Sequence, residues 1–177
     1  MRRYIAILLI ILPSACLAED YPPIDFHTDG IIQDGNAFSF VQVFDNATVN
    51  MTGGLIDIGG LWLYDSSVFN AYGGMINSPY IQVTEQATFN LYYLELSETH
   101  RIWAQDSATI NVYGKNFEYV PSSSDWLLNG NWANNEEFSL RLRGPDTRNY
   151  VFTYEIPEPG TFVLLIFGAL GLLKKNR

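Results

Sequence analysis

Apolar and polar residues alternate along the chain within a phrase that occurs four times, at residues 43–54, 63–74, 83–92 and 104–114. The third position of the phrase is always acidic: Asp45, Asp65, Glu85 and Asp106. The repeats therefore follow one another after 20, 20 and 21 residues. A fixed period near 20 residues is typical of one supersecondary unit stacked on itself.

Side chains within each repeat fall into two alternating classes, as they do in a pleated strand. One class is small or apolar and is predicted to face a core. It comprises Ala47, Val49, Met51, Ser67, Phe69, Ala71, Ala87, Phe89, Leu91, Ala108, Ile110 and Val112. The other class is rich in Thr, Asn and Tyr and is predicted to face outward.

A second apolar segment follows the first three repeats, at residues 55–58, 75–77 and 94–96. Gly-Gly pairs turn the corner in the first two units, and equivalent strands of successive units are expected to pair in parallel about 4.8 Å apart. We therefore predict an all-β fold, a short single-chain parallel β-solenoid of about four coils of 20–21 residues, over residues 35–115. A β-sandwich with coincidental internal similarity is the alternative, which four copies in register disfavour.

The segment before the repeats, residues 19–34, is interpreted as a linker or N-terminal cap. Its beginning is expected to be irregular, because it holds adjacent prolines and no copy of the phrase. The first coil is expected to begin near Ile31, with Val41 and Val43 facing inward. The third coil is one residue longer than the others, which predicts a β-bulge within residues 97–101.

The segment after the repeats, residues 116–156, is predicted to form a C-terminal β cap. Such a cap is needed because the open end of a solenoid exposes a row of unpaired backbone groups. Its strands are expected at residues 127–132, 137–143 and 149–156. Residues 115–124 are expected to form a loop.

The N-terminal residues 1–18 are predicted to be a secretory signal peptide. Two arginines precede an apolar run, and small residues lead up to Ala18, where a signal peptidase would cleave. Lipidation of Cys16 is the alternative, which Pro13 disfavours. Cys16 is the only cysteine, so the exported part has none with which to form a disulfide or a thiolate metal site.

The C-terminal residues 157–177 begin with Pro157, Glu158 and Pro159 and continue into twelve apolar residues and a basic end. A twelve-residue helix spans about 18 Å, less than the roughly 30 Å of a bilayer core. The basic end nevertheless favours a hydrophobic helix that anchors the chain with its last residues on the cytoplasmic side.

Charge is distributed unevenly between the ends and the middle of the chain. All 19 acidic residues lie between Glu19 and Glu158, against five basic residues, so this portion has a net charge of −14. A protein this acidic is a poor partner for nucleic acid, and none is expected.

The C-terminal arrangement of Pro-Glu-Pro, apolar stretch and basic end, together with the N-terminal signal, resembles the PEP-CTERM sorting signal of Gram-negative bacteria. The resemblance covers about the last twenty residues, with Lys-Lys-Asn-Arg in place of the usual arginine run. It implies transient anchoring in the inner membrane and processing near Pro157–Pro159 by the membrane protease exosortase. It also implies a cell-surface or extracellular protein associated with exopolysaccharide and biofilm, a class in which repeats of the Asp-Asn-Ala-Thr-Val-Asn type recur.

Two polar columns of the repeats are interpreted as structural. Asn50, Asn70, Asn90 and Asn111 recur with the period of the coils, and we expect their side chains to form a ladder of amide hydrogen bonds. The acidic column would offer oxygen ligands to Ca²⁺, but the chain lacks the Gly-Gly-x-Gly-x-Asp motif of calcium-binding β-rolls. Turn formation is therefore the preferred role, and no metal or cofactor is expected.

Aromatic residues form the candidate ligand-contact set: Tyr72, Tyr92, Tyr113, Trp62 and Trp103. Aromatic surfaces with interleaved Asn and Thr suit sugar rings, which offer C–H faces for stacking and hydroxyls for hydrogen bonding. The alternative is that the tyrosines merely stabilise the sheet through cross-strand contacts. The sequence leaves both interpretations open.

Evidence for catalysis is weak. His27 and His100 are the only histidines, and neither belongs to a catalytic motif. Asp106 with Arg101 is the best acid–base pair, but a surface ion pair is the preferred interpretation of it. We therefore predict a non-enzymatic, exported structural or adhesive protein. A carbohydrate-binding module is the alternative, and a polysaccharide-active enzyme ranks third.

Overall fold

The structure is a computed structural model that describes residues 21–156. The predicted signal peptide and the predicted sorting segment, including Pro157, Glu158 and Pro159, lie outside the described residues. Within residues 21–156, none of the helices has the length and apolarity needed to cross a membrane.

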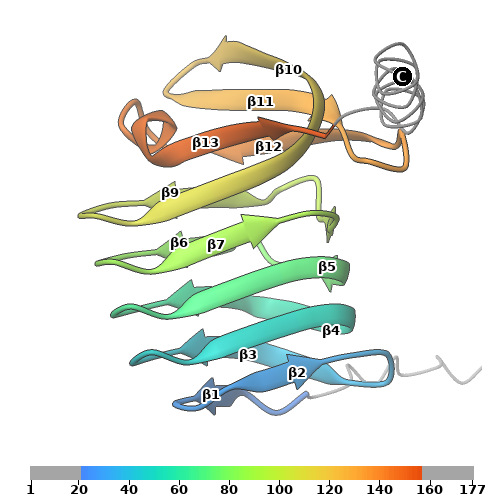
Figure 1. Ribbon diagram of the computed structural model, residues 1–177, viewed down its shortest axis with the longest axis vertical. Coiled ribbons are helices and arrows are strands. Elements are labelled where there is room, and N and C mark those ends of the chain that lie inside the picture. Colours follow the sequence, from blue (N-terminus) through green and yellow to red (C-terminus); the bar gives the residue numbers. More distant parts are fainter. Residues whose placement is uncertain (1–20, 157–177) are drawn as a thin grey trace, which may run out of the picture.

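The described part is all-β, with thirteen strands in one continuous sheet and a single short 3-10 helix (Figure 1). The strands are β1 (Ile24–Phe26), β2 (Gly30–Ile32), β3 (Ala37–Val43), β4 (Thr48–Leu63), β5 (Val68–Ile76), β6 (Tyr80–Val83), β7 (Thr88–Leu91), β8 (Glu95–Leu96), β9 (Arg101–Ala104), β10 (Thr109–Ser122), β11 (Asp125–Asn131), β12 (Glu137–Leu142) and β13 (Val151–Glu155). The helix η1 is Thr147–Tyr150.

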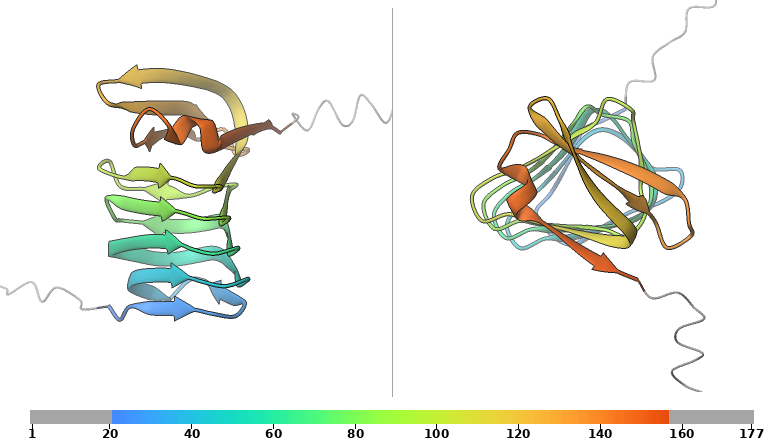
Figure 2. Two further views of the ribbon diagram at one scale, coloured as in Figure 1. Left: turned by 90° about the vertical axis from the view of Figure 1, so that its left-hand side faces the viewer. Right: turned by 90° about the horizontal axis from the view of Figure 1, so that it is seen from above.

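The strands wind into a β-solenoid of about four coils, which confirms the predicted solenoid class. Seen from above, each coil has three sides (Figure 2). Side A is formed by β2, the start of β4, the start of β5, β7 and the start of β10. Side B is formed by the start of β3, the middle of β4, the end of β5 and β8. Side C is formed by β1, the ends of β3 and β4, β6 and β9. Neighbouring coils pair in parallel throughout.

The core is built by the parity that the sequence predicted to face inward. On side A, Val49 lies over Phe69, which lies over Phe89, and all three side chains are fully buried. The rings of Phe69 and Phe89 meet edge to face with centroids 5.8 Å apart. On side C, Val41 and Val43 are fully buried as predicted. Burying a side chain of this size contributes about 1.5–3 kcal/mol.

The acidic column lies at the corner between sides C and A, where the backbone enters the left-handed region. The φ angles there are 59° for Asp45, 54° for Asp65, 60° for Glu85 and 63° for Asp106. Aspartate tolerates this conformation better than most residues because its short side chain bonds locally. Three of the carboxylates also accept a hydrogen bond from the backbone N–H one coil earlier. Asp65 accepts from Asp45 at 2.8 Å, Glu85 from Asp65 at 2.6 Å and Asp106 from Glu85 at 3.4 Å. The column thus stabilises the turns.

The asparagine column forms the ladder that the sequence predicted. The side-chain amide of Asn70 donates to Asn50 Oδ1 at 2.9 Å, Asn90 donates to Asn70 at 2.7 Å, and Asn111 donates to Asn90 at 2.7 Å. The side chains are half-buried on the outside of side A. The ladder therefore ties four successive coils together independently of the backbone.

The N-terminal segment is more regular than the sequence predicted. Ile24 pairs in parallel with Val41, and Ile31 pairs with Asn50, so β1 and β2 form a partial coil. The carboxylate of Asp29 accepts a hydrogen bond of 2.8 Å from the N–H of Thr48. Residues 21–23, which hold the adjacent prolines, are irregular as expected. From Ile24 on the expectation was wrong, because pairing with the first full coil orders the segment without a copy of the repeated phrase.

The prediction of a loop at residues 115–124 was also wrong. Strand β10 continues through Ser122 and pairs antiparallel with β11, with Val120 opposite Leu127. Phe117 and Tyr119 are partly buried against the core, and this apolar contact keeps the segment extended. The predicted bulge at residues 97–101 is absent as well, because the extra residue is accommodated in a turn between β8 and β9.

The C-terminal cap consists of the strands β11, β12 and β13 together with the second half of β10. β12 pairs antiparallel with β11 and meets β9 at one residue pair, Leu142 with Ile102. β13 returns parallel to the start of β10, with Phe152 beside Asn111. Leu128 and Leu140 are fully buried beneath this layer, so the cap closes the apolar core at this end.

Replacing Asn90 by Ala is expected to lower the free energy of unfolding by about 1–2 kcal/mol, because the Asn70 carbonyl and the Asn111 amide both lose a half-buried partner. Urea denaturation followed by circular dichroism measures the change. Thr88→Ala, on the same strand and the same side, is the matched control. Equal effects of the two substitutions would show that the ladder adds nothing to stability.

Candidate functional site

The outward tyrosines of side A stack on one another. The ring centroids of Tyr72 and Tyr92 are 4.6 Å apart with planes inclined by 16°, and those of Tyr92 and Tyr113 are 4.2 Å apart with planes inclined by 7°. Tyr154 of the cap extends the column at 5.0 Å. Tyr154 was not predicted as a fourth member of the column, because it lies outside the repeats.

Stacking changes what the tyrosine column offers to a ligand. The spacing of strands in a sheet, about 4.8 Å, brings identical rings of successive coils face to face. A sugar stacks on a free ring face, whereas inside this column the faces cover one another. Burial raises the pKa of Tyr92 to about 12, helped by the adjacent hydroxyls of Tyr113 and Tyr72. The column therefore presents ring edges and neutral hydroxyls, and the geometry favours its stabilising role.

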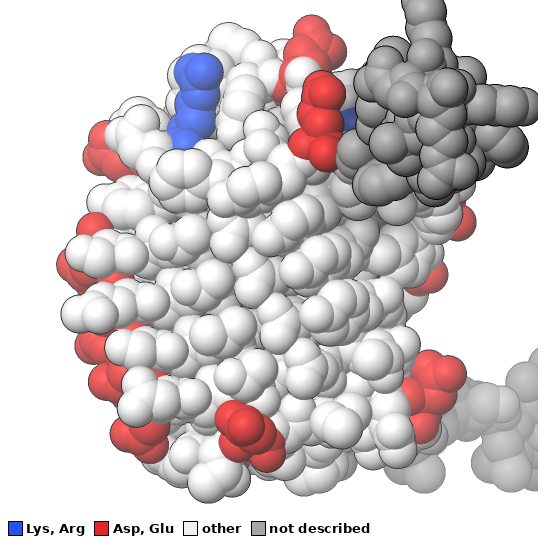
Figure 3. Space-filling model, viewed as in Figure 1, with Lys and Arg blue, Asp and Glu red and all other residues white. Residues whose placement is uncertain are grey.

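Side A as a whole carries little charge. Figure 3 shows this side as a broad uncharged surface, with acidic residues gathered at its edges, including the corner where the chain passes from side C to side A. The outward residues that follow one another up the stack are mostly Thr, Asn and Tyr. The result is a regular, uncharged and hydrogen-bonding surface.

The two tryptophans lie on side C, around a corner from the tyrosines. Trp62, Gln82 and Trp103 are in register on β4, β6 and β9. They border a recess of about 220 Å³ that Tyr80 and Arg101 also line. Trp103 is 37% exposed and Tyr80 is 51% exposed, so aromatic surface is open to solvent here. The structure thus divides the five predicted contact residues between two separate surfaces.

Two arginines add positive charge to this recess. The guanidinium of Arg143 lies over the Trp103 ring, 5.2 Å from its centroid. Arg101 Nε is 3.7 Å from Asp125 Oδ2, so this arginine is shared between the recess and the cap. These are two of the five basic residues between Tyr21 and Ile156. Sequence reasoning missed Arg143, because only the docking of β12 on β9 brings it beside Trp103.

Trp62 forms the inner wall of the recess. Phe40 meets its indole edge to face at 5.0 Å, and Tyr64 does so at 6.3 Å. Its indole Nε1 is buried and has no hydrogen-bond partner within the described part of the chain. This packing holds the tryptophan in one orientation.

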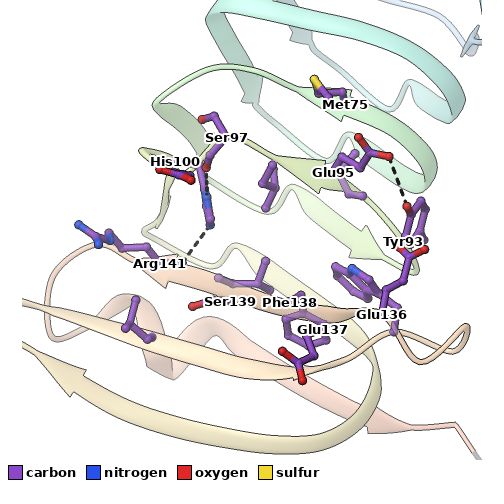
Figure 4. A pocket seen from close by; sticks show the side chains of 16 residues that line it. Met75, Tyr93, Glu95, Ser97, His100, Glu136, Glu137, Phe138, Ser139 and Arg141 are labelled. Atoms are coloured by element: carbon purple, nitrogen blue, oxygen red, sulfur yellow. Dashed lines mark hydrogen bonds between the residues drawn. The ribbon is translucent and has the colours of Figure 1, made fainter.

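A larger cavity than this recess lies between side B and the cap. It is a groove of about 570 Å³ lined by residues of the segment from Tyr93 to His100 and by β12 (Figure 4). We call it the side-B groove. Its carboxylates belong to Glu95, Glu98, Glu136 and Glu137.

His100 connects the two walls of the side-B groove. Its Nδ1 lies 2.6 Å from the Ser97 carbonyl oxygen, and its Nε2 accepts a hydrogen bond of 3.1 Å from the backbone N–H of Arg141. This arrangement requires the neutral ring with its proton on Nδ1. Burial lowers the pKa of His100 below its ordinary value. The histidine thus joins the third coil to the cap.

The remaining residues considered for catalysis are dispersed. His27 is exposed in the first partial coil, 2.9 Å from Asp45 Oδ2 and stacked on Phe44. Arg101 forms its ion pair with Asp125, whereas the Asp106 carboxylate accepts the Glu85 N–H at 3.4 Å. The predicted Asp106–Arg101 pair is therefore replaced by two separate structural contacts.

Comparisons with protein-family models, curated proteins and solved structures find no match for this chain. Its function is therefore argued from its surfaces. The uncharged side A and the aromatic recess of side C are the two that bear on the roles predicted from the sequence.

The free energy of unfolding is expected to fall as the pH drops below about 6.5, because the unfolded chain then binds a proton at His100 that the folded state, with its lowered pKa, resists. Urea midpoints at pH 7.5 and 5.5 measure this difference. His100→Gln is expected to reduce the difference, since it removes the titrating ring. The matched control His27→Gln, at the exposed histidine, is expected to retain it, and equal slopes for all three proteins would contradict the assignment.

Proposed function

We propose that the protein is an exported, non-enzymatic structural or adhesive component of a bacterial cell surface or extracellular matrix. The observation that carries this proposal is the continuity of the outward columns from coil to coil, which gives side A a regular and uncharged surface. The resemblance of the C-terminal segment to an exosortase sorting signal supports an extracellular location.

A regular surface suits a partner that is itself repetitive. Successive coils present similar hydrogen-bonding groups about 4.8 Å apart, and the asparagine ladder fixes their relative positions. A polysaccharide chain offers repeated hydroxyls with which such a surface can bond. The proposed role thus depends on many weak contacts along the stack, with exopolysaccharide as the partner.

Export and sorting are tested by the intact mass of the protein recovered from cells and from medium, with and without exosortase. The expected mature species begins near Glu19 and ends near Pro157–Pro159, and its C-terminal processing depends on exosortase. Signal peptidase accounts for the first cleavage and exosortase for the second. An unprocessed C-terminal segment in both strains would refute the sorting route.

The second candidate function is carbohydrate binding at the recess of side C. It is favoured by the exposed faces of Trp103 and Tyr80 beside the amide of Gln82. Aromatic faces stack on the C–H surface of a sugar ring, while the amide bonds its hydroxyls. This recess replaces the tyrosine column as our preferred carbohydrate site, because the tyrosine faces cover one another.

The arginines of the recess favour a carboxylated sugar. A guanidinium binds a carboxylate through two parallel hydrogen bonds, a geometry that a neutral sugar does not use. Arg143 makes no ion pair within the described residues, so its charge is available to a ligand. A polysaccharide that contains uronic acids is therefore the proposed ligand class.

Oligogalacturonate is expected to change the tryptophan fluorescence of the protein and to bind more tightly than a neutral galactose oligomer of equal length. Trp103→Ala and Arg143→Gln are each expected to weaken binding about tenfold, as loss of one stacking or charged contact does. The triple change of Tyr72, Tyr92 and Tyr113 to Ala is the comparison, and circular dichroism checks each fold.

Three results would count against this site. Equal binding of the neutral oligomer would remove the role of the arginines. Loss of binding in the tyrosine variant alone would return the site to side A. Failure of both oligomers to bind would leave the structural role without a carbohydrate site in the recess.

A further inference from the structure

The solenoid ends differently on its three sides. On side A, β10 lies on β7 and β13 lies on β10, while on side C β12 meets β9. On side B the stack stops at β8, which among the described strands pairs only with β5. Beyond Gly114, where the next side-B strand would begin, β10 leaves the stack and pairs with β11 instead. One edge of β8 is therefore unpaired.

A second strand edge borders the same space. β12 pairs along its whole length with β11. On its other edge Leu142 meets β9 and the N–H of Arg141 donates to His100 Nε2, which leaves the edge from Glu137 to Leu140 without a strand partner. Residues Glu137 to Arg141 line the side-B groove together with Glu95 and Leu96 of β8 (Figure 4). Two strand edges thus border one cavity of about 570 Å³ without pairing to each other.

The groove combines an apolar lining with an acidic rim. Leu94, Trp132 and Leu140 are buried side chains that line it. The carboxylates of Glu95, Glu98, Glu136 and Glu137 belong to exposed residues, and Arg141 is the only arginine or lysine of the lining. The rim therefore has an excess of negative charge.

The side chain of Tyr93 reports the same excess of negative charge. A hydrogen bond to Glu136 raises its pKa to about 12, with further contributions from burial and from the charges of Glu136 and Glu95. Its hydroxyl oxygen also lies 3.4 Å from Glu95 Oε1, so the two carboxylates share one donor. The proximity of these carboxylates to one phenol agrees with a rim that attracts cations.

We propose that the side-B groove binds an extended basic segment of a partner protein by strand addition. The unpaired edges of β8 and β12 supply backbone donors and acceptors, and such edges are known templates for an added strand. Side chains of an extended segment alternate in direction, so every second residue meets the apolar lining and the others meet the glutamates. Lysine or arginine at the latter positions complements the rim.

The residues that follow Ile156 in this chain make a poorer occupant. Pro157 and Pro159 have no backbone N–H to donate to a strand edge, and Glu158 adds a negative charge to an acidic rim. The groove is therefore assigned to a different chain. This inference concerns side B and is independent of the proposed carbohydrate sites.

The test uses the purified protein and three fluorescently labelled peptides of six residues. The first alternates Lys with Val, the second replaces each Lys by Glu, and the third is the Lys peptide with alternate backbone nitrogens methylated. The Lys peptide is expected to bind at least tenfold more tightly than either of the others by fluorescence anisotropy. Methylation removes the donors that strand addition needs and leaves the charge unchanged.

Protein variants locate the binding site. The double change Glu95→Gln and Glu137→Gln is expected to weaken binding of the Lys peptide about tenfold. The matched control Asp34→Asn with Glu118→Gln removes two exposed carboxylates outside the groove and is expected to bind as the parent does. Equal binding of the methylated peptide, equal weakening by the control pair, or no binding of the Lys peptide at 1 mM (roughly −4 kcal/mol) would each overturn the proposal.

Discussion

Parallel pairing between coils of nearly equal length is the constraint on which the rest of this structure depends. Once β4 pairs with β5 and β5 with β7, each paired residue is placed over the residue one period earlier, apart from a local shift at Thr52. Identical side chains then meet at the strand spacing, and their chemistry decides the result. Asparagines bond to one another, tyrosines stack, and carboxylates accept the N–H of the preceding coil. Each of these columns is a consequence of the parallel pairing of successive coils in register.

The same constraint explains how much the sequence predicts. The period and the parity identify the solenoid and its buried residues, because both are local properties of the repeats. The roles of β1, β2 and the second half of β10 were missed, since pairing with distant strands orders these segments. The recess of side C was missed for a related reason. Trp103 and Arg143 are far apart in the sequence and meet only where the cap docks on β9. The sequence could not decide whether the tyrosine rings stack on one another, because the period gives the spacing of the side chains but does not give their orientation.

The cap covers the last strand of each of the three sides in a different way. Side A receives another parallel strand, side C receives a single residue pair beside His100 and Arg141, and side B receives none among the described strands. A repeating stack meeting a non-repeating hairpin cannot match all three sides at once. The aromatic recess and the acidic groove both border this junction. The distinctive surfaces of the molecule are therefore found where its regularity ends.

The turn between β8 and β9 has a consequence for how such a chain can change in evolution. The third coil carries one additional residue, yet Tyr80 and Arg101 remain paired and the sheet keeps its register. A corner can therefore accept a small insertion, whereas the same insertion within a strand would reverse the orientation of every following side chain. Duplication of a whole period would be different again, because it would add about 4.8 Å of height and leave each side unchanged. The height of the stack and the chemistry of its sides can therefore vary separately, and duplication of coils could lengthen the molecule without changing the residues on its surfaces.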